Sequence, residues 1–174
     1  MSALSELLAH KAAANEAYKA KDLTEAIAGY SKAISLLPVL GEPNDSDDEE
    51  NTTPRSAVDG ELLTQGAIVL CNRAAAYMGE NKPIPALADA QRASDFDPDN
   101  WKSHWRTGLA LMMMKPRLER SEQAIAAFKR AKESPTLPTS ERENVNKAIA
   151  HAEYRFKEGQ DSLDMPDMSN CCIS

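Results

Sequence analysis

The sequence predicts an all-α fold built from a short array of similar helix pairs. Apolar and small residues recur at spacings of three and four in "LLAHKAAANEAY", "AIVLCNRAAAYM" and "AIAAFKRA", which is the periodicity of a helix with one buried face. Glycine is scarce, the prolines gather between these runs, and no segment alternates apolar and polar residues as a half-buried strand does. In addition, one pattern of residues occurs more than once along the chain, which is typical of repeat architectures.

The repeated pattern is clearest in "AIAGYSKAISLLP" and "ALADAQRASDFDP". Equivalent residues of these two stretches are separated by 60 positions in every case: Ala26 and Ala86, Tyr30 and Ala90, Ala33 and Ala93, Pro38 and Pro98. An alanine precedes each stretch by the same distance, at Ala14 and at Ala74. A third copy runs from "WKSHWRTGLALM" into "EQAIAAFKRA" and contains Gly108, Ala124, Phe128 and Ala131. We therefore expect three copies of one helical unit.

This pattern resembles the tetratricopeptide repeat (TPR), a helix-turn-helix unit of about 34 residues with small residues where its two helices cross. Gly108 stands 34 residues after Ala74, so the second and third copies keep that period. The resemblance implies a right-handed superhelical solenoid with repeats at about 7–38, 67–98 and 101–135. The third copy departs from the pattern, because its "MKPRLERSE" turn is four residues longer than the turns of the other two.

An acidic insertion separates the first two copies, which stand 60 residues apart instead of about 34. The stretch "EPNDSDDEE", from Glu42 to Glu50, holds six acidic residues and no cation. Low apolar content and high charge predict a disordered insertion over about 40–58. Outside this stretch, acidic and basic residues nearly balance.

A final helix is predicted at about 140–158. "SEREN" offers Ser140 as an N-cap with Glu143 three residues later, and Gly159 is the expected stop. Such a helix would cover the last apolar face of an open-ended stack. We expect residues 1–159 to form one three-repeat domain and residues 160–174, which have too little apolar content to pack, to form a disordered tail.

The composition excludes several classes of function. The 174 residues include 27 acidic and 20 basic ones, so the chain lacks the basic excess of a nucleic-acid-binding protein. Neither a leader sequence nor a run long enough to cross a bilayer is present, which predicts a cytosolic protein. The histidines and cysteines match no metal-ligand spacing, and no phosphate-binding loop or nucleophile elbow occurs. We therefore predict no metal, no cofactor and no catalytic residue.

Five polar residues on the first helices of the three copies would face a common groove in a repeat stack. The first copy supplies Lys11 and Asn15, the second Asn72, and the third Lys102 and Arg106. In "KSHWR", Lys102 and Arg106 lie four residues apart, where like charges on one helix face repel. Any one of the five alone would be ordinary solvated surface. Five such residues in three copies favour a shared anionic ligand instead.

Counted from the start of each copy, these positions are similar to those of the dicarboxylate-clamp subfamily of TPR domains, which carry Lys, Asn, Asn, Lys and Arg there. The resemblance implies recognition of the extreme C-terminus of heat-shock protein 90 and heat-shock protein 70 chaperones, which end in Glu-Glu-Val-Asp. It implies roles for all five residues: Lys11, Asn15 and Asn72 on the main-chain carboxylate, Lys102 on the aspartate side chain, and Arg106 on the group just upstream.

The chemistry of the five residues agrees with such a ligand. A C-terminal aspartate carries two carboxylates, and two lysines, an arginine and two amide groups can saturate both with hydrogen bonds. Ala75 and Met78, one and two turns after Asn72, are expected to form an apolar shelf under the valine of the ligand.

The last four residues, "CCIS", fit a prenylation box in which Cys171 is the acceptor and Ser174 selects farnesyl. A single lipid chain gives only reversible membrane binding. We therefore expect a non-enzymatic co-chaperone of the cytoplasm with reversible membrane association through a farnesyl group at Cys171.

Two other functions remain open from the sequence. The chain could be a repeat scaffold that binds an internal peptide or a folded partner, without needing a free C-terminus in the ligand. Alternatively, it could be the targeting module of a larger isomerase or phosphatase. Binding of an acidic peptide with a free and an amidated end separates the clamp from the general scaffold.

Overall fold

The computed structural model describes residues 2–40 and 53–163, with side chains described up to Gly159. Within these residues, seven α-helices follow one another: α1 (Ala3–Lys19), α2 (Leu23–Ile34), α3 (Gly60–Gly79), α4 (Pro83–Phe96), α5 (Trp101–Met113), α6 (Leu118–Glu133) and α7 (Arg142–Leu163). Two short 3-10 helices, η1 (Arg55–Ala57) and η2 (Thr139–Glu141), precede α3 and α7. The prediction of an all-α fold is confirmed.

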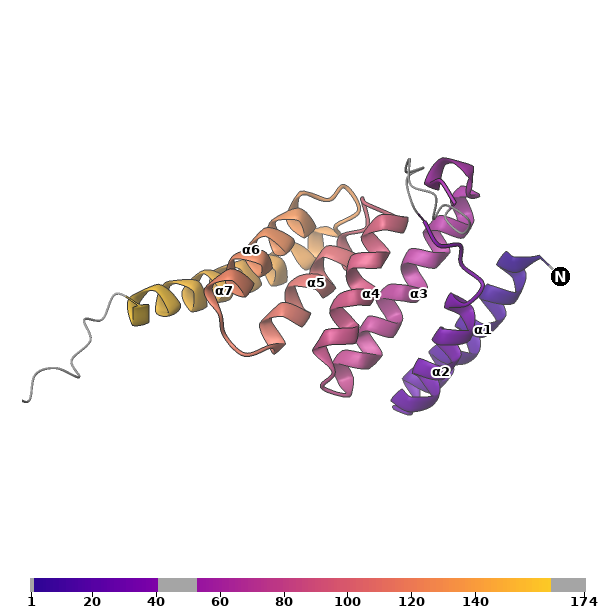
Figure 1. Cartoon of the computed structure of the whole chain (residues 1–174), viewed down its shortest axis with the longest axis horizontal. Helices are drawn as coiled ribbons and strands as arrows, with labels where there is room; N and C mark the ends of the chain where they lie inside the picture. Colours follow the sequence, from indigo (N-terminus) through magenta and orange to yellow (C-terminus); the bar gives the residue numbers. More distant parts are fainter. Residues whose placement is uncertain (1, 41–52, 164–174) are drawn as a thin grey trace, which may run out of the picture.

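The helices form three antiparallel hairpins that stack in chain order. Each helix packs against the next one along the chain, and α1 contacts α3 while α3 contacts α5. Figure 1 shows the hairpins along the long axis of the molecule, with α1 and α2 at one end and α7 at the other. The first helices of the three hairpins therefore lie side by side, as a TPR stack requires.

The turns inside the first two hairpins have the same backbone geometry. Lys21 and Asn81, which are separated by the 60-residue offset of the repeat, have positive φ values of 63° and 57°. Asp22 then caps α2 by accepting a hydrogen bond from the Glu25 backbone, whereas α4 begins with Pro83 at its first turn. The left-handed residue reverses the chain in one step, so both second helices start at the same place relative to their first helices.

The third hairpin shows where the extra residues of its predicted long turn lie. Helix α6 has 16 residues, against 12 in α2 and 14 in α4, and it begins at Leu118. The additional residues thus lengthen α6 at its N-terminus instead of forming a wide loop. Its packing is close, because a Cβ atom on Gly108 would overlap the Phe128 ring, and the Trp105 and Phe128 ring centroids lie 5.2 Å apart.

The described flanks of the acidic insertion meet each other. Residues 41–52 of the predicted insertion lie outside the described part of the chain. On either side of them, Leu40 and Thr53 form an isolated parallel bridge, and the Thr53 backbone N–H donates to the Val39 carbonyl at 2.8 Å. Arg55, in η1, donates to the Phe96 carbonyl at the end of α4. The last part of the segment predicted to be disordered is therefore structured and contacts the second hairpin.

The last helix differs from its predicted limits. Ser140, the predicted N-cap, lies within η2, and α7 begins at Arg142. Gly159, the predicted stop, lies inside α7, which continues to Leu163, so the predicted tail from residue 160 begins as helix. The physical reason for the glycine is packing: it has no positive φ, and a Cβ atom there would lie 2.9 Å from the Leu118 side chain.

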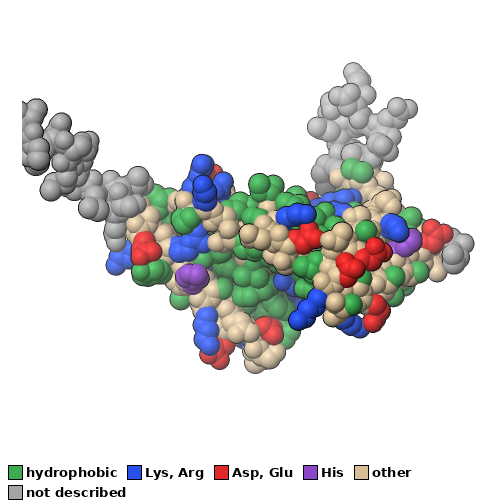
Figure 2. Space-filling view, turned by 90° about the horizontal axis from the view of Figure 1, so that it is seen from below, with side chains coloured by type: hydrophobic (Ala, Val, Ile, Leu, Met, Phe, Trp, Pro, Cys, Tyr) green, Lys and Arg blue, Asp and Glu red, His purple; other side chains and the backbone are tan. Residues whose placement is uncertain are grey.

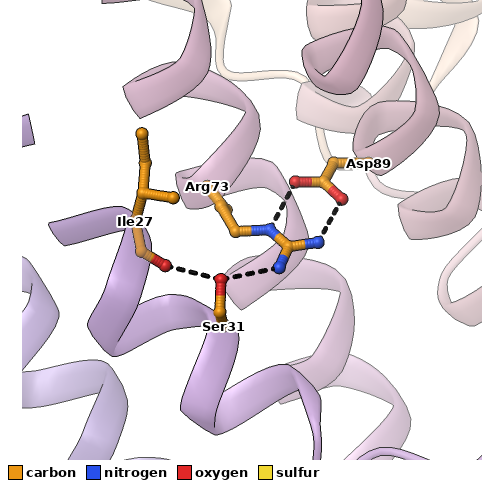
Figure 3. A network of polar contacts seen from close by, with 4 residues as sticks. All are labelled: Ile27, Ser31, Arg73 and Asp89. Carbon is orange, nitrogen blue, oxygen red and sulfur yellow. Dashed lines mark hydrogen bonds and ion pairs between the residues drawn. The ribbon is translucent and has the colours of Figure 1, made fainter. Parts of the chain in front are cut away.

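A buried polar network joins the first two hairpins (Figure 3). Arg73 of α3 donates to both carboxylate oxygens of Asp89 on α4, at 2.7 Å each, and to the Ser31 hydroxyl on α2 at 2.9 Å. Ser31 in turn donates to the Ile27 carbonyl at 2.7 Å. Three of the five N–H donors of this arginine bond within the fold, and its charge is paired with that of Asp89.

Candidate functional site

A hollow of about 170 Å³ lies between α1, α3 and α5, the first helices of the three hairpins. Its walls are formed by side chains from α1, α2, α3 and α5: Asn15, Tyr18, Lys19, Tyr30, Asn72, Ala75 and Arg106. Three of the five predicted clamp residues, one from each repeat, are in this set: Asn15, Asn72 and Arg106. The structure therefore brings together residues that are far apart in the sequence.

Asn15 is the centre of the hydrogen bonds in the hollow. Its Oδ1 accepts a hydrogen bond from the Tyr30 hydroxyl at 2.7 Å and another from Asn72 Nδ2 at 3.2 Å. Tyr30 reaches this point from α2, and it is buried. Two of the predicted residues, from the first and second repeats, are thus in direct contact.

Lys11 lies one turn before Asn15 on α1 and does not line the hollow itself. Its Nζ donates to Gln65 Oε1 at 2.6 Å, across the contact between α1 and α3. An ammonium group has three donors, so this bond leaves two for another partner. Gln65 precedes Asn72 by seven residues, which places both on one face of α3.

Arg106 carries a buried donor without a partner. Its Nε has no hydrogen-bond acceptor within the described structure, although the atom is shielded from solvent. Lys102 is exposed and lies one turn earlier, in the first turn of α5, where Asn100 caps the helix by accepting from the Lys102 backbone. Arg106, in the second turn of α5, lines the hollow, whereas Lys102 is not among the lining residues.

The charges of Arg106 and Lys102 affect the pKa of a buried thiol on the neighbouring helix α3. Burial raises the pKa of the Cys71 thiol on α3 to about 12, while Arg106 and Lys102 both act in the opposite direction. Asp97 and Asp89 add to the effect of burial, and the net shift of the Cys71 pKa is upward.

The hollow is electrostatically suited to an anion. Its lining residues include no carboxylate and two cations, Arg106 and Lys19, of which the exposed Lys19 pairs with Glu16 at 2.7 Å. A buried or partly buried cation without a paired acid is unfavourable in a low-dielectric site. A ligand carboxylate would supply the missing acceptor through a charge-assisted hydrogen bond.

The two residues predicted as an apolar shelf are placed differently from each other. Ala75 lines the hollow, one turn from Asn72. Met78 is half-buried and packs against a cluster that contains Ala74, Ala86, Ala90 and Ala110, and it is not part of the lining. Ala75 is therefore in a position to contact a ligand of the hollow.

One face of the molecule also carries apolar surface. Figure 2 shows hydrophobic side chains gathered in a depression in the middle of the face seen from below in Figure 1, with Lys and Arg side chains at its margin. Three large hydrophobic side chains are exposed at helix ends next to the turns within the hairpins: Tyr18 on α1, Ile84 on α4 and Met113 on α5.

A second hollow, of about 440 Å³, lies on another side of α5 and contains none of the predicted residues. It is lined mainly by α4, α5 and α6: Gln91, Ser94, Asp95, His104, Thr107, Leu111, Gln123, Ala126, Ala127 and Arg130. Although it is larger, it combines an acid, a base and neutral groups without a buried unpaired charge, so its chemistry favours no particular ligand.

The predicted lipid acceptor, Cys171, lies outside the described residues. Within the described residues, none of the helices has the length and apolar content to cross a bilayer.

Sequence reasoning missed four residues at or beside the hollow: Tyr18, Lys19, Tyr30 and Gln65. Three of them carried a usable signal. Tyr18 and Lys19 follow Asn15 by three and four residues, and Gln65 precedes Asn72 by seven, so helical periodicity puts them on the same faces. Tyr30 carried none, because its position in the repeat is that of a packing residue on a second helix.

No protein-family model matches the chain, and no curated protein matches it in sequence. Solved structures do match it. The TPR domain of Arabidopsis OM64 has a TM-score of 0.59 and 24% sequence identity, over 90% of this chain and 98% of that chain.

Two further structures contain a ligand according to their descriptions. The TPR2B domain of yeast Sti1, in a complex with pHsp70, has a TM-score of 0.64 and 16% identity, over 87% of this chain and 98% of that chain. The first TPR domain of Spaghetti (RPAP3), bound to the HSP90 peptide SRMEEVD, has a TM-score of 0.56 and 22% identity, over 84% of this chain and 94% of that chain. Together with the helix order and the turn geometry, these likenesses identify the fold of this chain as a tetratricopeptide-repeat solenoid.

Proposed function

We propose that this chain is a non-enzymatic adaptor that binds the acidic C-terminal tail of a chaperone of the heat-shock protein 90 or 70 class. The ligand would end in Glu-Glu-Val-Asp, and its terminal aspartate would enter the hollow between α1, α3 and α5. The proposal rests on the five residues of the clamp pattern and on the chemistry of the hollow.

The observation that carries the proposal is the unpaired Arg106 beside Asn15 and Asn72. All three line one hollow, no carboxylate is among the lining residues, and Arg106 Nε is buried without an acceptor. A buried polar group normally has a partner within the fold or in its ligand. The missing partner here is an acceptor, and a carboxylate is the strongest acceptor available to an arginine.

The proposed roles are those implied by the resemblance to the dicarboxylate clamp. Lys11, Asn15 and Asn72 would bind the main-chain carboxylate of the terminal aspartate, and Lys102 its side chain. Arg106 would bind the group just upstream. Ala75, which also lines the hollow, would contact the valine. Met78 is a weaker candidate for this contact because it packs into an internal cluster.

The structural neighbours support the same class of ligand. One of them is described as bound to an HSP90 peptide that ends in EEVD, and another as a complex with pHsp70. The matches cover 84% and 87% of this chain. Their identities of 22% and 16% support the fold, so the ligand must be tested on this chain itself.

The test is a titration with a synthetic peptide ending in Glu-Glu-Val-Asp, prepared with a free and with an amidated C-terminus. The free acid should bind, and amidation should remove most of the affinity because it abolishes one of the two carboxylates. The double variant Lys102→Ala, Arg106→Ala should also lose binding while keeping its helical circular-dichroism signal. Loss of one charged hydrogen bond typically costs about 1.5–3 kcal/mol.

A matched control variant is Lys32→Ala, Lys132→Ala. Both lysines are exposed on second helices, so this pair changes the net charge as much as the test pair without touching the hollow. Its affinity should equal that of the wild type. Equal binding of the free and amidated peptides would contradict the clamp and favour a scaffold for internal peptides.

A further inference from the structure

We infer that Tyr30 is a positioning residue of this site: its hydroxyl fixes the amide of Asn15 so that the Asn15 N–H groups face the ligand. This inference rests on the proposed function and adds a residue from a second helix to a site otherwise built from first helices. The Tyr30 hydroxyl is the group that orients the Asn15 amide with its N–H groups toward the ligand.

The geometry leaves Asn15 only donors to offer. Asn15 Oδ1 accepts from the Tyr30 hydroxyl at 2.7 Å and from Asn72 Nδ2 at 3.2 Å. An amide oxygen has two lone pairs, so both are used by the protein. The two N–H bonds of Asn15 Nδ2 then remain, in a side chain that lines the hollow. A carboxylate needs donors, and this orientation supplies two.

Tyr30 is suited to be the donor of its bond. Burial raises the pKa of its hydroxyl, the neighbouring Tyr18 raises it further, and a hydrogen bond from Asn72 acts in the opposite direction. The net effect is a pKa above the ordinary value of 10.0, so the hydroxyl keeps its proton throughout the physiological range. Tyr30 can therefore donate to Asn15 whether or not a ligand is present.

The opposite orientation of the Asn15 amide conflicts with Asn72. With Asn72 unchanged, rotation of the Asn15 amide by a half turn would point its amino group at Asn72 Nδ2, so that two donors would face each other. It would also leave the Tyr30 hydroxyl without its acceptor in a buried position. An unsatisfied buried donor costs stability, so the network selects the orientation in which Asn15 faces the hollow with its amino group.

The third repeat shows that the ring alone is enough for packing. Phe128 occupies the position in α6 that Tyr30 occupies in α2, as the repeat pattern of the sequence indicates. Both side chains are fully buried, each with 1% of its surface exposed. Phe128 packs against Gly108 without a hydroxyl. The Tyr30 hydroxyl is thus not needed for packing, and it is the group that contacts Asn15.

The inference is tested by a double-mutant cycle between Tyr30→Phe and Asn15→Ala, measured as affinity for the free-acid Glu-Glu-Val-Asp peptide. Tyr30→Phe keeps the ring and removes only the hydroxyl, and it should weaken binding by about 2- to 10-fold. In the Asn15→Ala background the same change should have no further effect, because Tyr30 acts through Asn15. A purely structural role would give losses of equal size in both backgrounds.

A second variant, Asn15→Asp, tests whether the ligand needs the N–H donors of Asn15 or only a polar side chain at this position. It keeps the acceptor for Tyr30 and for Asn72 but replaces the amino group with a second carboxylate oxygen. The variant should stay folded and lose binding of the free acid. Tyr154→Phe, an exposed tyrosine on α7, is the matched control for removing a hydroxyl and should bind like the wild type.

The outcomes distinguish this inference from the proposed function. If the wild type fails to bind the free-acid peptide, the proposed function is wrong. If the wild type binds but Tyr30→Phe binds equally well, or loses the same factor with and without Asn15, the role of Tyr30 is wrong while the clamp stands. Retained binding by Asn15→Asp would overturn the assignment of Asn15 as a donor.

Discussion

Arg73 and Asp89 form a two-pronged ion pair between α3 and α4, with both contacts at 2.7 Å. Their side chains expose only 17% and 7% of their surfaces. Arg106, 33 residues after Arg73, is shielded at Nε, and this atom has no hydrogen-bond partner in the described part of the chain. Arg73 is therefore held by the fold, whereas Arg106 is the arginine that we propose binds the ligand. This contrast leads to the first two predictions.

Asp89→Ala should strongly destabilise the domain. The change leaves Arg73 buried without its counter-ion, and breaking a buried pair in this way costs about 3–5 kcal/mol. Urea denaturation followed by circular dichroism measures the free energy of unfolding. Asp95→Ala, an exposed acid on the same helix, is the control and should change it by less than about 0.5 kcal/mol. A small effect of Asp89→Ala would mean that the pair is not needed for stability.

Arg106→Met should have the opposite effect on stability and remove peptide binding. Methionine fills similar space without an unsatisfied buried donor, so the free energy of unfolding should rise by about 1 kcal/mol. The same denaturation experiment and the peptide titration measure both quantities. The comparison variant is Arg73→Met, which should lower stability because it removes a paired arginine. If Arg106→Met destabilises as much as Arg73→Met, then Arg106 is a structural residue.

Gln65→Ala should weaken binding of the free-acid peptide without a large change in stability. Gln65 holds Lys11 Nζ at 2.6 Å, so its loss frees the lysine side chain and raises the entropy cost of binding. We expect a loss of about 2- to 10-fold in affinity, measured by calorimetric titration. Gln91→Ala, an exposed glutamine on α4, is the control. Unchanged affinity would show that Lys11 needs no partner in the free protein.

Stability should fall as the pH rises above about 9, in part because of Cys71. Its pKa is 9.0 in an exposed chain and about 12 in the fold, where burial disfavours the thiolate. Between these values the folded state keeps a proton that the unfolded state releases, so the stabilisation is complete below the lower pKa and declines toward the higher one. The decline from one such group approaches about 1.4 kcal/mol per pH unit.

Cys71→Ser tests this pH dependence, because a serine hydroxyl does not titrate in this range. Denaturation midpoints at about pH 8 and about pH 10 should differ less in the variant than in the wild type. The raised pKa of Tyr30 acts in the same direction only at higher pH, since its ordinary value is 10.0. Equal pH dependence in both proteins would show that Cys71 is not protected in the folded state.

The repeat pattern alone was sufficient to predict the class of fold and the helices that carry the polar residues. The 60-residue offset recurs in the structure as matching positive-φ turn residues, Lys21 and Asn81. Such features are local, because they depend on residues adjacent in the chain. The same reasoning located Asn15, Asn72 and Arg106, which line a common hollow.

Two sequence signals were misleading, because the same residue type can serve two purposes. Gly159 reads as a helix stop, yet it lies inside α7 because a larger side chain would meet Leu118. The long third turn reads as a loop, yet its extra residues extend α6. In both cases the outcome depends on which neighbouring helix surface is available for packing, and that is a tertiary property.

The sequence by itself determined the periodicity, the repeat and the face of each first helix, since these follow from spacings along one chain. Only the tertiary structure decided that Tyr30 meets Asn15, that Gln65 holds Lys11, and that Arg73 is paired while Arg106 is not. These relationships depend on how far and at what angle two helices cross. That distance and angle are set by the side chains packed between them, which no single segment specifies.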